Sequence, residues 1–213
     1  MNKVADIVRL FVHKPASHNG NIELKNIAFE ADQASIFGPP TEHFKQKFYM
    51  NDGWFDPKDL ACHWYDKVQA AKDRSYAWRI FAEECGSQFM TAVGKLREDN
   101  NSHRAVMYYN TLPTEPATEN ACCTSATIIC NSNKTIDYYA SYRSNDAWRA
   151  WANDYAWHSF VHNLVISRFD RSYTRGKIYW HAINLYVLKE DVEKAFRPMM
   201  SQGWRGMLEE KNT

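Results

Sequence analysis

Several features that would place this 213-residue chain in a special class are missing or scarce. Its five cysteines form no Cys-x-x-Cys pair and are odd in number, which argues against a disulfide framework and a cysteine zinc site. Only His158 and His162 have the i,i+4 spacing of metal ligands, and no Glu lies between them, so we expect no metal site. A formal net charge of +1 provides no electrostatic attraction for a nucleic-acid polymer or an anionic membrane.

Long apolar runs, internal repeats and low-complexity tracts are also absent. The N-terminal stretch MNKVADIVRLFVHK is interrupted by Asp6 and Arg9, so it lacks the apolar segment of a signal peptide, and no later run is long enough to cross a membrane. The composition is 45% hydrophobic and 24% charged, which suffices for a full core. We therefore expect a single domain over residues 1–213, a cytoplasmic location with reduced cysteines, and a small molecule as any nucleotide ligand.

The spacing of apolar residues predicts the secondary structure. Strands are expected at residues 21–30, 104–110, 124–130, 134–142 and 176–188, with the turn Asn131-Ser132-Asn133 joining the third to the fourth. Helices are expected at residues 4–13, 42–50, 154–166 and 190–197, and over 62–98 with a break near Asp73 or Gly86. Hairpins mixed with helical crossovers are typical of an α+β fold, in which helices cover a mixed sheet.

Side chains that can carry chemistry concentrate in RSNDAWRAWANDYAWH, from Arg143 to His158. A guanidinium beside a hydroxyl, at Arg143 and Ser144, can bind phosphate, although the pair also suits a surface ion pair and a cap. Asp146 and Asp154 both suit the capping of a helix N-terminus. A carboxylate eleven residues after Arg143 could instead read the edge of a base. Taken singly, each residue has an ordinary structural explanation.

Cys123 opens the strand whose hairpin partner ends near Arg143. Successive strand residues point to opposite faces, so only one of Cys122 and Cys123 can face a given pocket. With the turn near residues 132–133, the hairpin would place Cys123 opposite residues 142–143 and Arg143 beside its sulfur, where the guanidinium would lower the thiol pKa. The alternative is a buried cysteine that acts as a small hydrophobe.

Together these residues resemble the thymidylate synthase superfamily, and within it the bacteriophage deoxycytidylate hydroxymethylases. The resemblance rests on CTS at Cys123, RSND beginning twenty residues later, and NDYAW, whose Asp lies eleven residues after Arg143. Assigning the nucleophile to Cys122 would need an extra residue in the hairpin. Further segments resemble the family in order along the chain: NIELKNIAFEADQASIFGPP, SYAWRIFAEE, NSHRAVMYY and GKIYWHAINLYV.

The resemblance implies a chemistry as well as a fold. Cys123 would be the nucleophile that adds to C6 of a pyrimidine nucleotide, with 5,10-methylenetetrahydrofolate as the cofactor and 5-hydroxymethyl-dCMP as the product. The residue matching Asp154 is Asn in thymidylate synthases, where its amide complements uracil. An Asp accepts from the amino group of cytosine and, when protonated, donates to N3. Asp154 would therefore select cytosine.

The same resemblance assigns binding roles and a partner. A homodimer packed through its sheets is implied, in which Arg104 reaches the phosphate bound by the neighbouring subunit. The remaining roles are phosphate binding by Arg143 and Ser144, contact with the sugar by Tyr186, and contact with the folate by Asp146 and Trp78.

Two departures from the family pattern leave an alternative open. The family has a catalytic Glu on an early helix, where this chain has FKQKFYMNDGW, with Phe48 or Met50 near that position and Asp52 close by. The sugar-binding His and Tyr of the family correspond either to Tyr186 and Leu188 or, with a shift of two residues, to Asn184 and Tyr186. The first hypothesis is a folate-dependent hydroxymethylase, and the second is a weak or inactive relative that binds nucleotides or partners an active enzyme.

Overall fold

The computed structural model describes residues 4–32, 76–82, 87–110 and 121–192. Their strands form one mixed sheet in the order β1-β6-β4-β3-β2, and the short β5 pairs with β6. β4 and β6 run parallel, as do β5 and β6, whereas the other pairs are antiparallel. The strands are β1 (Ile22–Glu30), β2 (Val106–Tyr108), β3 (Cys123–Cys130), β4 (Thr135–Tyr142), β5 (Asn145–Asp146) and β6 (Thr174–Val187).

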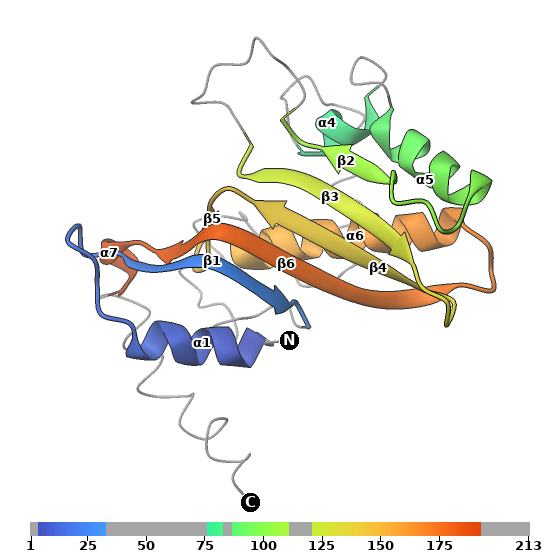
Figure 1. Cartoon of the computed structure of the whole chain (residues 1–213). Coiled ribbons are helices and arrows are strands. Elements are labelled where there is room, and N and C mark those ends of the chain that lie inside the picture. The colour runs from blue at the N-terminus through green and yellow to red at the C-terminus, as the bar shows by residue number, and fades with distance from the viewer. Residues whose placement is uncertain (1–3, 33–75, 83–86, 111–120, 193–213) are drawn as a thin grey trace, which may run out of the picture.

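Helices pack on one face of this sheet and along its two edges. The long helix α6 (Trp151–Arg168) links β5 to β6 and crosses behind the sheet in Figure 1, as the connection between parallel strands requires. Helices α4 (Tyr76–Phe81) and α5 (Gln88–Glu98) lie beside β2, and α1 (Val4–His13) packs against β1. A single turn, α7 (Lys189–Asp191), follows β6.

The β3–β4 hairpin contains the irregularity that shapes the candidate site. Its turn is closed by the Asn131 N–H, which donates to the Thr135 carbonyl at 2.8 Å. From Cys130 back to Ser125 the register is regular, but a β-bulge lies between Ser125 and Cys123, and Cys123 pairs with Tyr142. A bulge sets two residues of one strand against one of the other, so it shifts the end of the hairpin by one residue.

The core between the sheet and α6 is rich in aromatic side chains. Trp180 of β6 stacks on Tyr142, with ring centroids 4.5 Å apart, and packs against Trp151 at 4.6 Å. Each such pair adds about 0.5–1.5 kcal/mol beyond the area it buries. This cluster therefore fixes the first turn of α6 against the ends of β4 and β6, where the candidate site is built.

Most sequence predictions are confirmed where the structure describes the residues. The strands match within about two residues, except that β2 is shorter than predicted. Of the helical stretch predicted over 62–98, the described residues show α4 and α5, with Ala82 and Ser87 outside either helix, while residues 62–75 and 83–86 lie outside the described residues. Helix α6 begins at Trp151, three residues before the predicted start. The predicted helix at 42–50 lies outside the described residues, as does most of the one at 190–197.

A six-stranded mixed sheet with helices is compatible with the predicted α+β class. The single domain over 1–213 stays a prediction, because the described ranges leave long parts of the chain out. Within the described ranges, none of the helices combines the length and the apolar character that crossing a membrane would require.

Candidate functional site

Most of the predicted site residues meet where β3, β4 and β5 approach the start of α6. Electrostatic contacts link Cys122 to Arg143, Asp146 and Asp154, and Tyr186 to Asp146 and Cys122. Three further residues belong to this group: Ser144 and Asn145 contact it through hydrogen bonds, and the charge of Asp154 acts on the thiol of Cys123. We call the whole group the Asp154 cluster. Its members are Cys122, Cys123, Arg143, Ser144, Asn145, Asp146, Asp154 and Tyr186.

Cys123 is fully buried at the inner end of this cluster, whereas Cys122 is exposed. The Cys123 thiol donates to the Ser125 carbonyl at 3.6 Å. Burial raises the pKa of this thiol well above its usual value, and the nearby charge of Asp154 raises it further. A hydrogen bond with Tyr142 acts in the opposite direction, because a donor to sulfur favours the thiolate.

Arg143 is placed next to Cys122, whereas the sequence predicted it beside the Cys123 sulfur. In a hairpin without the bulge, the register would pair Cys123 with Arg143; the bulge pairs Cys123 with Tyr142 instead. The Arg143 N–H accordingly donates to the Cys122 carbonyl at 3.0 Å, and its Nε donates to the Ala121 carbonyl at 3.2 Å. Partial burial raises the pKa of the Cys122 thiol and the charge of Arg143 lowers it.

Asp154 lies within the first turn of α6 and is not its cap. The helix begins at Trp151, and the Asp154 N–H already donates to the Ala150 carbonyl at 2.9 Å, so the capping explanation is wrong for this residue. Its carboxylate is only 6% exposed, and its Oδ2 accepts a hydrogen bond from Asn145 Nδ2 at 2.7 Å. Burial raises the pKa of Asp154 to about 7, against the lowering effect of the Asn145 hydrogen bond.

Asp146, in contrast, does cap a turn. Its Oδ1 accepts from the N–H groups of Trp148 and Arg149, at 2.9 Å and 2.8 Å, which is the geometry of a capping carboxylate. Both bonds use the same oxygen, so Oδ2 keeps the capacity to accept from a ligand. Burial raises the pKa of Asp146, and the two backbone bonds lower it.

Tyr186 brings β6 into the cluster. It is the register partner of Asp146 in the β5–β6 pair, and its side chain is half-buried. Burial raises its pKa, and a hydrogen bond with Ser144 lowers it. The hydroxyls of Ser144 and Tyr186 therefore lie close together, and the neighbouring residue Arg143 is exposed.

A buried group of tyrosines around His158 was missed by sequence reasoning. His158 is fully buried, with Nδ1 2.9 Å from the Tyr138 hydroxyl and Nε2 2.7 Å from the Tyr142 hydroxyl. The even spacing of Tyr138 and Tyr142 places both on one face of β4, and that spacing was the available signal. His158 is therefore a core histidine with both ring nitrogens hydrogen-bonded.

Two predicted residues lie outside the Asp154 cluster. Arg104 is exposed. The neighbouring Ala105 carbonyl accepts from the Ile128 N–H, which is five strand positions, roughly 16 Å, from Cys123 along β3, and Arg104 lies one residue farther away. Trp78 is half-buried on α4. This short helix also carries Tyr76, whose hydroxyl accepts from the Cys123 N–H at 3.1 Å. The positions near the family's catalytic Glu, Phe48, Met50 and Asp52, lie outside the described residues.

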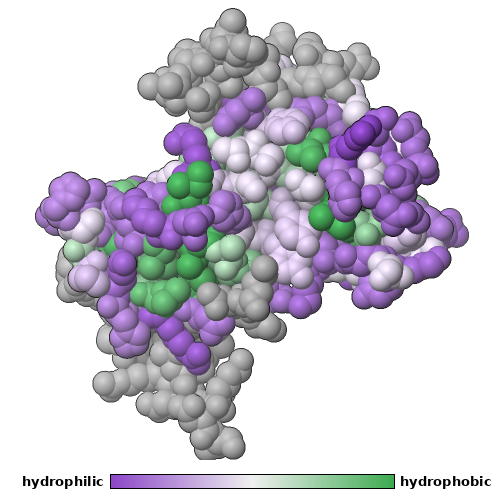
Figure 2. Space-filling model, in the orientation of Figure 1, coloured by the Kyte–Doolittle hydropathy of each residue, from purple (hydrophilic) through white to green (hydrophobic). Residues whose placement is uncertain are grey.

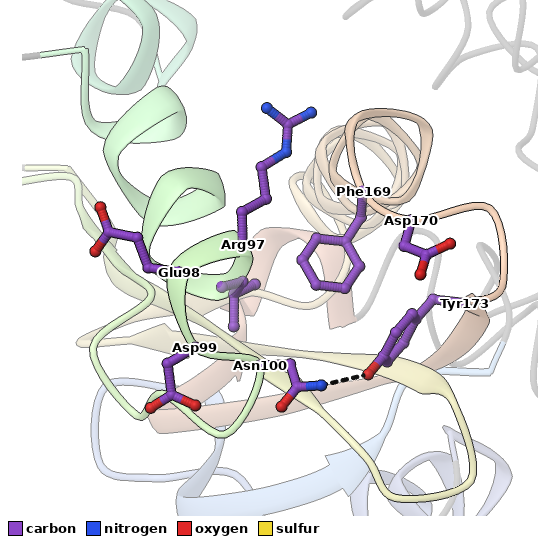
Figure 3. Close-up of a pocket in the computed structure, with 8 residues that line it drawn as sticks. Arg97, Glu98, Asp99, Asn100, Phe169, Asp170 and Tyr173 are labelled. Carbon is purple, nitrogen blue, oxygen red and sulfur yellow. Dashed lines mark hydrogen bonds between the residues drawn. The ribbon is translucent and has the colours of Figure 1, made fainter.

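A separate pocket lies at the opposite end of the sheet, between the end of α5 and the segment that follows α6 (Figure 3). Asn100 Nδ2 donates to the Tyr173 hydroxyl at 3.0 Å across it. Most of its lining is polar or charged, with Phe169 and Leu96 as the apolar part. It contains no residue of the Asp154 cluster. Within the described ranges, no group of three or more His, Cys, Asp or Glu side chains is arranged to hold a metal ion.

Burial of Asp154 predicts a pH-dependent stability. Because its folded pKa, about 7, is above the usual value of 3.8, the folded state binds more protons and stability falls as pH rises between these values. Asp154→Asn keeps an oxygen that accepts from Asn145 and cannot ionise, so it should raise the free energy of unfolding at pH 8 by about 2–4 kcal/mol. The gain should shrink towards pH 4. Denaturant unfolding between pH 4 and pH 8 measures it.

The control is Asp170→Asn. Asp170 is exposed and its pKa is lowered by hydrogen bonds with Ser172, so this variant should lose stability slightly over the same range. Equal stabilities of the wild type and Asp154→Asn from pH 5 to pH 8 would show that folding does not raise the pKa of the Asp154 carboxyl.

Comparisons with known proteins show a distant similarity between this chain and three phage enzymes. No family model matches the chain. Proteins called deoxycytidylate 5-hydroxymethyltransferase from Enterobacteria phages T4, T2 and T6 are each 26% identical to it over 186 residues. The matches cover 78% of this chain and 75% of each relative. This similarity supports a relationship to transferases of the hydroxymethyltransferase type.

Proposed function

We propose that this protein is a folate-dependent pyrimidine nucleotide hydroxymethyltransferase that converts dCMP, or a related cytidine monophosphate, to its 5-hydroxymethyl derivative. The distant relatives support a hydroxymethyltransferase-like activity in general terms. The observation that carries the finer proposal is the buried Asp154–Asn145 pair.

This pair suits the edge of cytosine, which offers an amino donor at C4 and an acceptor at N3. With a pKa raised to about 7, Asp154 can take up a proton near neutral pH. Because Oδ2 already accepts from Asn145, the proton is favoured on Oδ1. The carboxyl group can then present both a donor and an acceptor, as cytosine requires. An Asn in its place would present the pattern that matches uracil.

The reaction assigns a task to other members of the Asp154 cluster. Arg143 and Ser144 bind the phosphate, and the hydroxyl of Tyr186 binds the sugar. The Cys123 thiolate forms the Sγ–C6 bond, which moves the C5–C6 electron pair to C5 and makes that carbon nucleophilic. At the end of the cycle the C5 proton has been lost, water has supplied the hydroxyl oxygen, and the Sγ–C6 bond breaks to return the thiolate.

5,10-Methylenetetrahydrofolate, when bound, would supply the one-carbon unit at C5. The residues present fit such a ligand at one point that the structure shows: Asp146 Oδ2 keeps acceptor capacity, and N–H groups of a pterin ring are donors that a carboxylate can accept. Trp78, half-buried on α4, would provide an aromatic surface for the ring.

The proposal predicts a specific product from a specific substrate. Purified protein incubated with labelled methylenetetrahydrofolate should transfer label to dCMP, giving 5-hydroxymethyl-dCMP, and should leave dUMP unchanged. A parallel incubation with CMP shows whether the protein accepts ribose as well as deoxyribose nucleotides. Chromatography with mass detection identifies the product. If the label were found only in thymidylate formed from dUMP, the activity would be methyl transfer and not hydroxymethyl transfer.

The complete burial of Cys123 and its raised thiol pKa favour a second candidate, a weak or inactive relative that binds nucleotides or partners an active enzyme. In that case the incubation yields no labelled nucleotide with any of the three substrates, while calorimetry still detects dCMP binding. Retention of a nucleophile beside a base-reading carboxyl favours the enzyme, since a binding module needs no thiol.

We also propose a homodimer formed through the sheet. Figure 2 shows the face of the sheet opposite α6, where apolar side chains gather among polar ones. Ile183 of β6 and Tyr108 of β2 are each 57% exposed. Arg104, remote from its own Cys123, would then reach the phosphate site of the second subunit. Sedimentation at micromolar concentration would show whether the dimer forms.

A further inference from the structure

Arg149 lies just before α6, and its side chain bonds to α7. Its Nε donates to Asp191 Oδ2 at 2.5 Å, and its Nη2 donates to Glu190 Oε1. The side chains of Arg149 and Asp191 are only 22% and 17% exposed, so solvent screens this ion pair weakly. A planar guanidinium that bonds to two carboxylates is fixed in direction as well as in position. The side chain of Arg149 is therefore anchored on α7.

The backbone of Arg149 is bonded to Asp146. The N–H groups of Trp148 and Arg149 both donate to Asp146 Oδ1, at 2.9 Å and 2.8 Å. The Ala150 N–H donates to the Asp146 carbonyl at 3.1 Å. We call residues 146–150 the Asp146 turn. Arg149 thus connects α7 to the backbone donors that orient the Asp146 carboxylate.

α7 is itself anchored to the turn that precedes β1. The Lys189 N–H donates to Asn21 Oδ1 at 3.0 Å. Gly20, with a φ of +84°, packs so closely on Lys189 that a β carbon at this position would lie 2.6 Å from its Cδ. Val192, directly after α7, is 1% exposed. Bonds and packing that do not involve Arg149 therefore keep α7 in place.

The aim of the Asp146 carboxylate depends on this arrangement, because its two oxygens differ. Oδ1 accepts both backbone bonds of the Asp146 turn, whereas Oδ2 keeps the capacity to accept from a ligand. The direction of Oδ2 is therefore set by the positions of the Trp148 and Arg149 N–H groups. A displacement of the turn by about 1 Å would misalign a ligand bond to Oδ2, and misaligned hydrogen bonds weaken steeply.

Arg149 also affects the charge of this carboxylate. Burial raises the pKa of Asp146, the charge of Asp191 raises it further, and the charge of Arg149 lowers it. A substitution that removes the guanidinium charge would therefore change two properties of Asp146 at once. Arg149→Lys keeps the positive charge and loses the planar fork, so it isolates the effect on position.

We propose that Arg149 is a positioning residue: by joining α7 to the Asp146 turn, it holds Asp146 Oδ2 where it can accept a hydrogen bond from the folate. The effect on catalysis rests on the proposed function, in which Asp146 contacts the folate. The connection between Arg149 and the turn does not depend on that function, and it can be measured in the protein alone.

The first experiment measures the connection by amide hydrogen exchange. In Arg149→Lys and in Asp191→Asn, the amides of residues 148 and 149 should exchange about tenfold faster than in the wild type, because a turn released from α7 opens more often. Asp191→Asn weakens the ion pair from the side of α7 and alters no residue of the turn. Unchanged exchange in both variants would overturn the proposal, whatever the protein catalyses.

The second experiment measures the consequence for the ligand by steady-state kinetics. In Arg149→Lys the KM for methylenetetrahydrofolate should rise about tenfold, whereas the KM for dCMP should stay within about twofold. Asp191→Asn should show the same split. A residue with only a structural role would lower the free energy of unfolding and leave both KM values unchanged.

The matched control is Arg175→Lys. Arg175 also donates from two nitrogens, to Asn163 Oδ1 and Ser159 Oγ, each at 3.2 Å. It lies near the start of β6, whereas Tyr186, the register partner of Asp146, lies near the end of that strand. Both KM values and the exchange of the turn amides should match the wild type. Circular dichroism confirms that all three variants fold.

The two readouts separate the failures. Suppose that the turn amides exchange faster in the variants, but the wild type neither binds methylenetetrahydrofolate nor forms product. The proposed function and the folate role of Arg149 then fail together, while the connection between Arg149 and the turn stands. If the wild type is active and both variants keep its KM for methylenetetrahydrofolate, Arg149 does not position Asp146 for the folate and the proposal is overturned.

Discussion

Replacing Cys123 by Ser should lower turnover by about three powers of ten or more, whereas Cys122→Ser should keep it within about tenfold. A serine hydroxyl is a much weaker nucleophile than a thiolate near neutral pH. The measurement is the rate of 5-hydroxymethyl-dCMP formation by each variant, together with mass spectrometry of the adduct trapped on the wild type. The adduct should be located on Cys123 in the peptide that contains both cysteines.

The contrast between the two cysteines is informative because each has one favourable feature. Partial burial raises the pKa of the Cys122 thiol, but Cys122 is exposed to solvent and the charge of Arg143 opposes the rise. Cys123 is buried, but its spacing to the Arg-Ser pair follows the family pattern. An adduct on Cys122, with turnover lost in Cys122→Ser and retained in Cys123→Ser, would reverse the assignment.

Asp154→Asn should exchange the base preference of the protein. The amide offers a donor where cytosine offers one too, so binding of dCMP should weaken, and the same amide complements uracil, so binding of dUMP should strengthen. A buried hydrogen-bond mismatch costs about 1–3 kcal/mol, which is about one to two powers of ten in affinity for each nucleotide. Titration calorimetry of both nucleotides with both proteins measures the exchange.

Asp137→Asn is the matched control for this exchange. Asp137 is a buried carboxyl group of the same sheet, but it accepts from the Lys177 N–H at 2.7 Å near the far end of β4. It should therefore leave the ratio of dCMP to dUMP affinity unchanged. Asp154→Asn could keep the wild-type ratio of dCMP to dUMP affinity and still show the expected gain in stability at pH 8. Asp154 would then be a buried carboxyl group with a raised pKa that does not contact the base.

The sequence by itself determined most of the strands and helices, and it identified the stretch of residues that can carry chemistry. Alternation in TIDYYASY and the turn Asn131-Ser132-Asn133 are local signals, and they predicted the β3–β4 hairpin that the structure contains. The stretch from Arg143 to Asp154 was identified as a candidate site because its residue types and spacing can be counted along the chain. The start of α6 was placed three residues late, since apolar Trp151 and Ala152 carry no capping signal.

Only the tertiary structure decided how these residues are arranged. The bulge between Cys123 and Ser125 pairs Cys123 with Tyr142, and Arg143 lies next to Cys122. A one-residue shift of register leaves no trace in the hydrophobic pattern. The partner of Asp154 is a similar case, because Asn145 reaches it across the connection between β5 and α6. His158 of α6 likewise contacts the hydroxyls of Tyr138 and Tyr142 of β4, which lie 20 and 16 residues earlier in the sequence. Hydrogen-bond partners of buried groups are fixed by packing in three dimensions, so no local pattern could have named them.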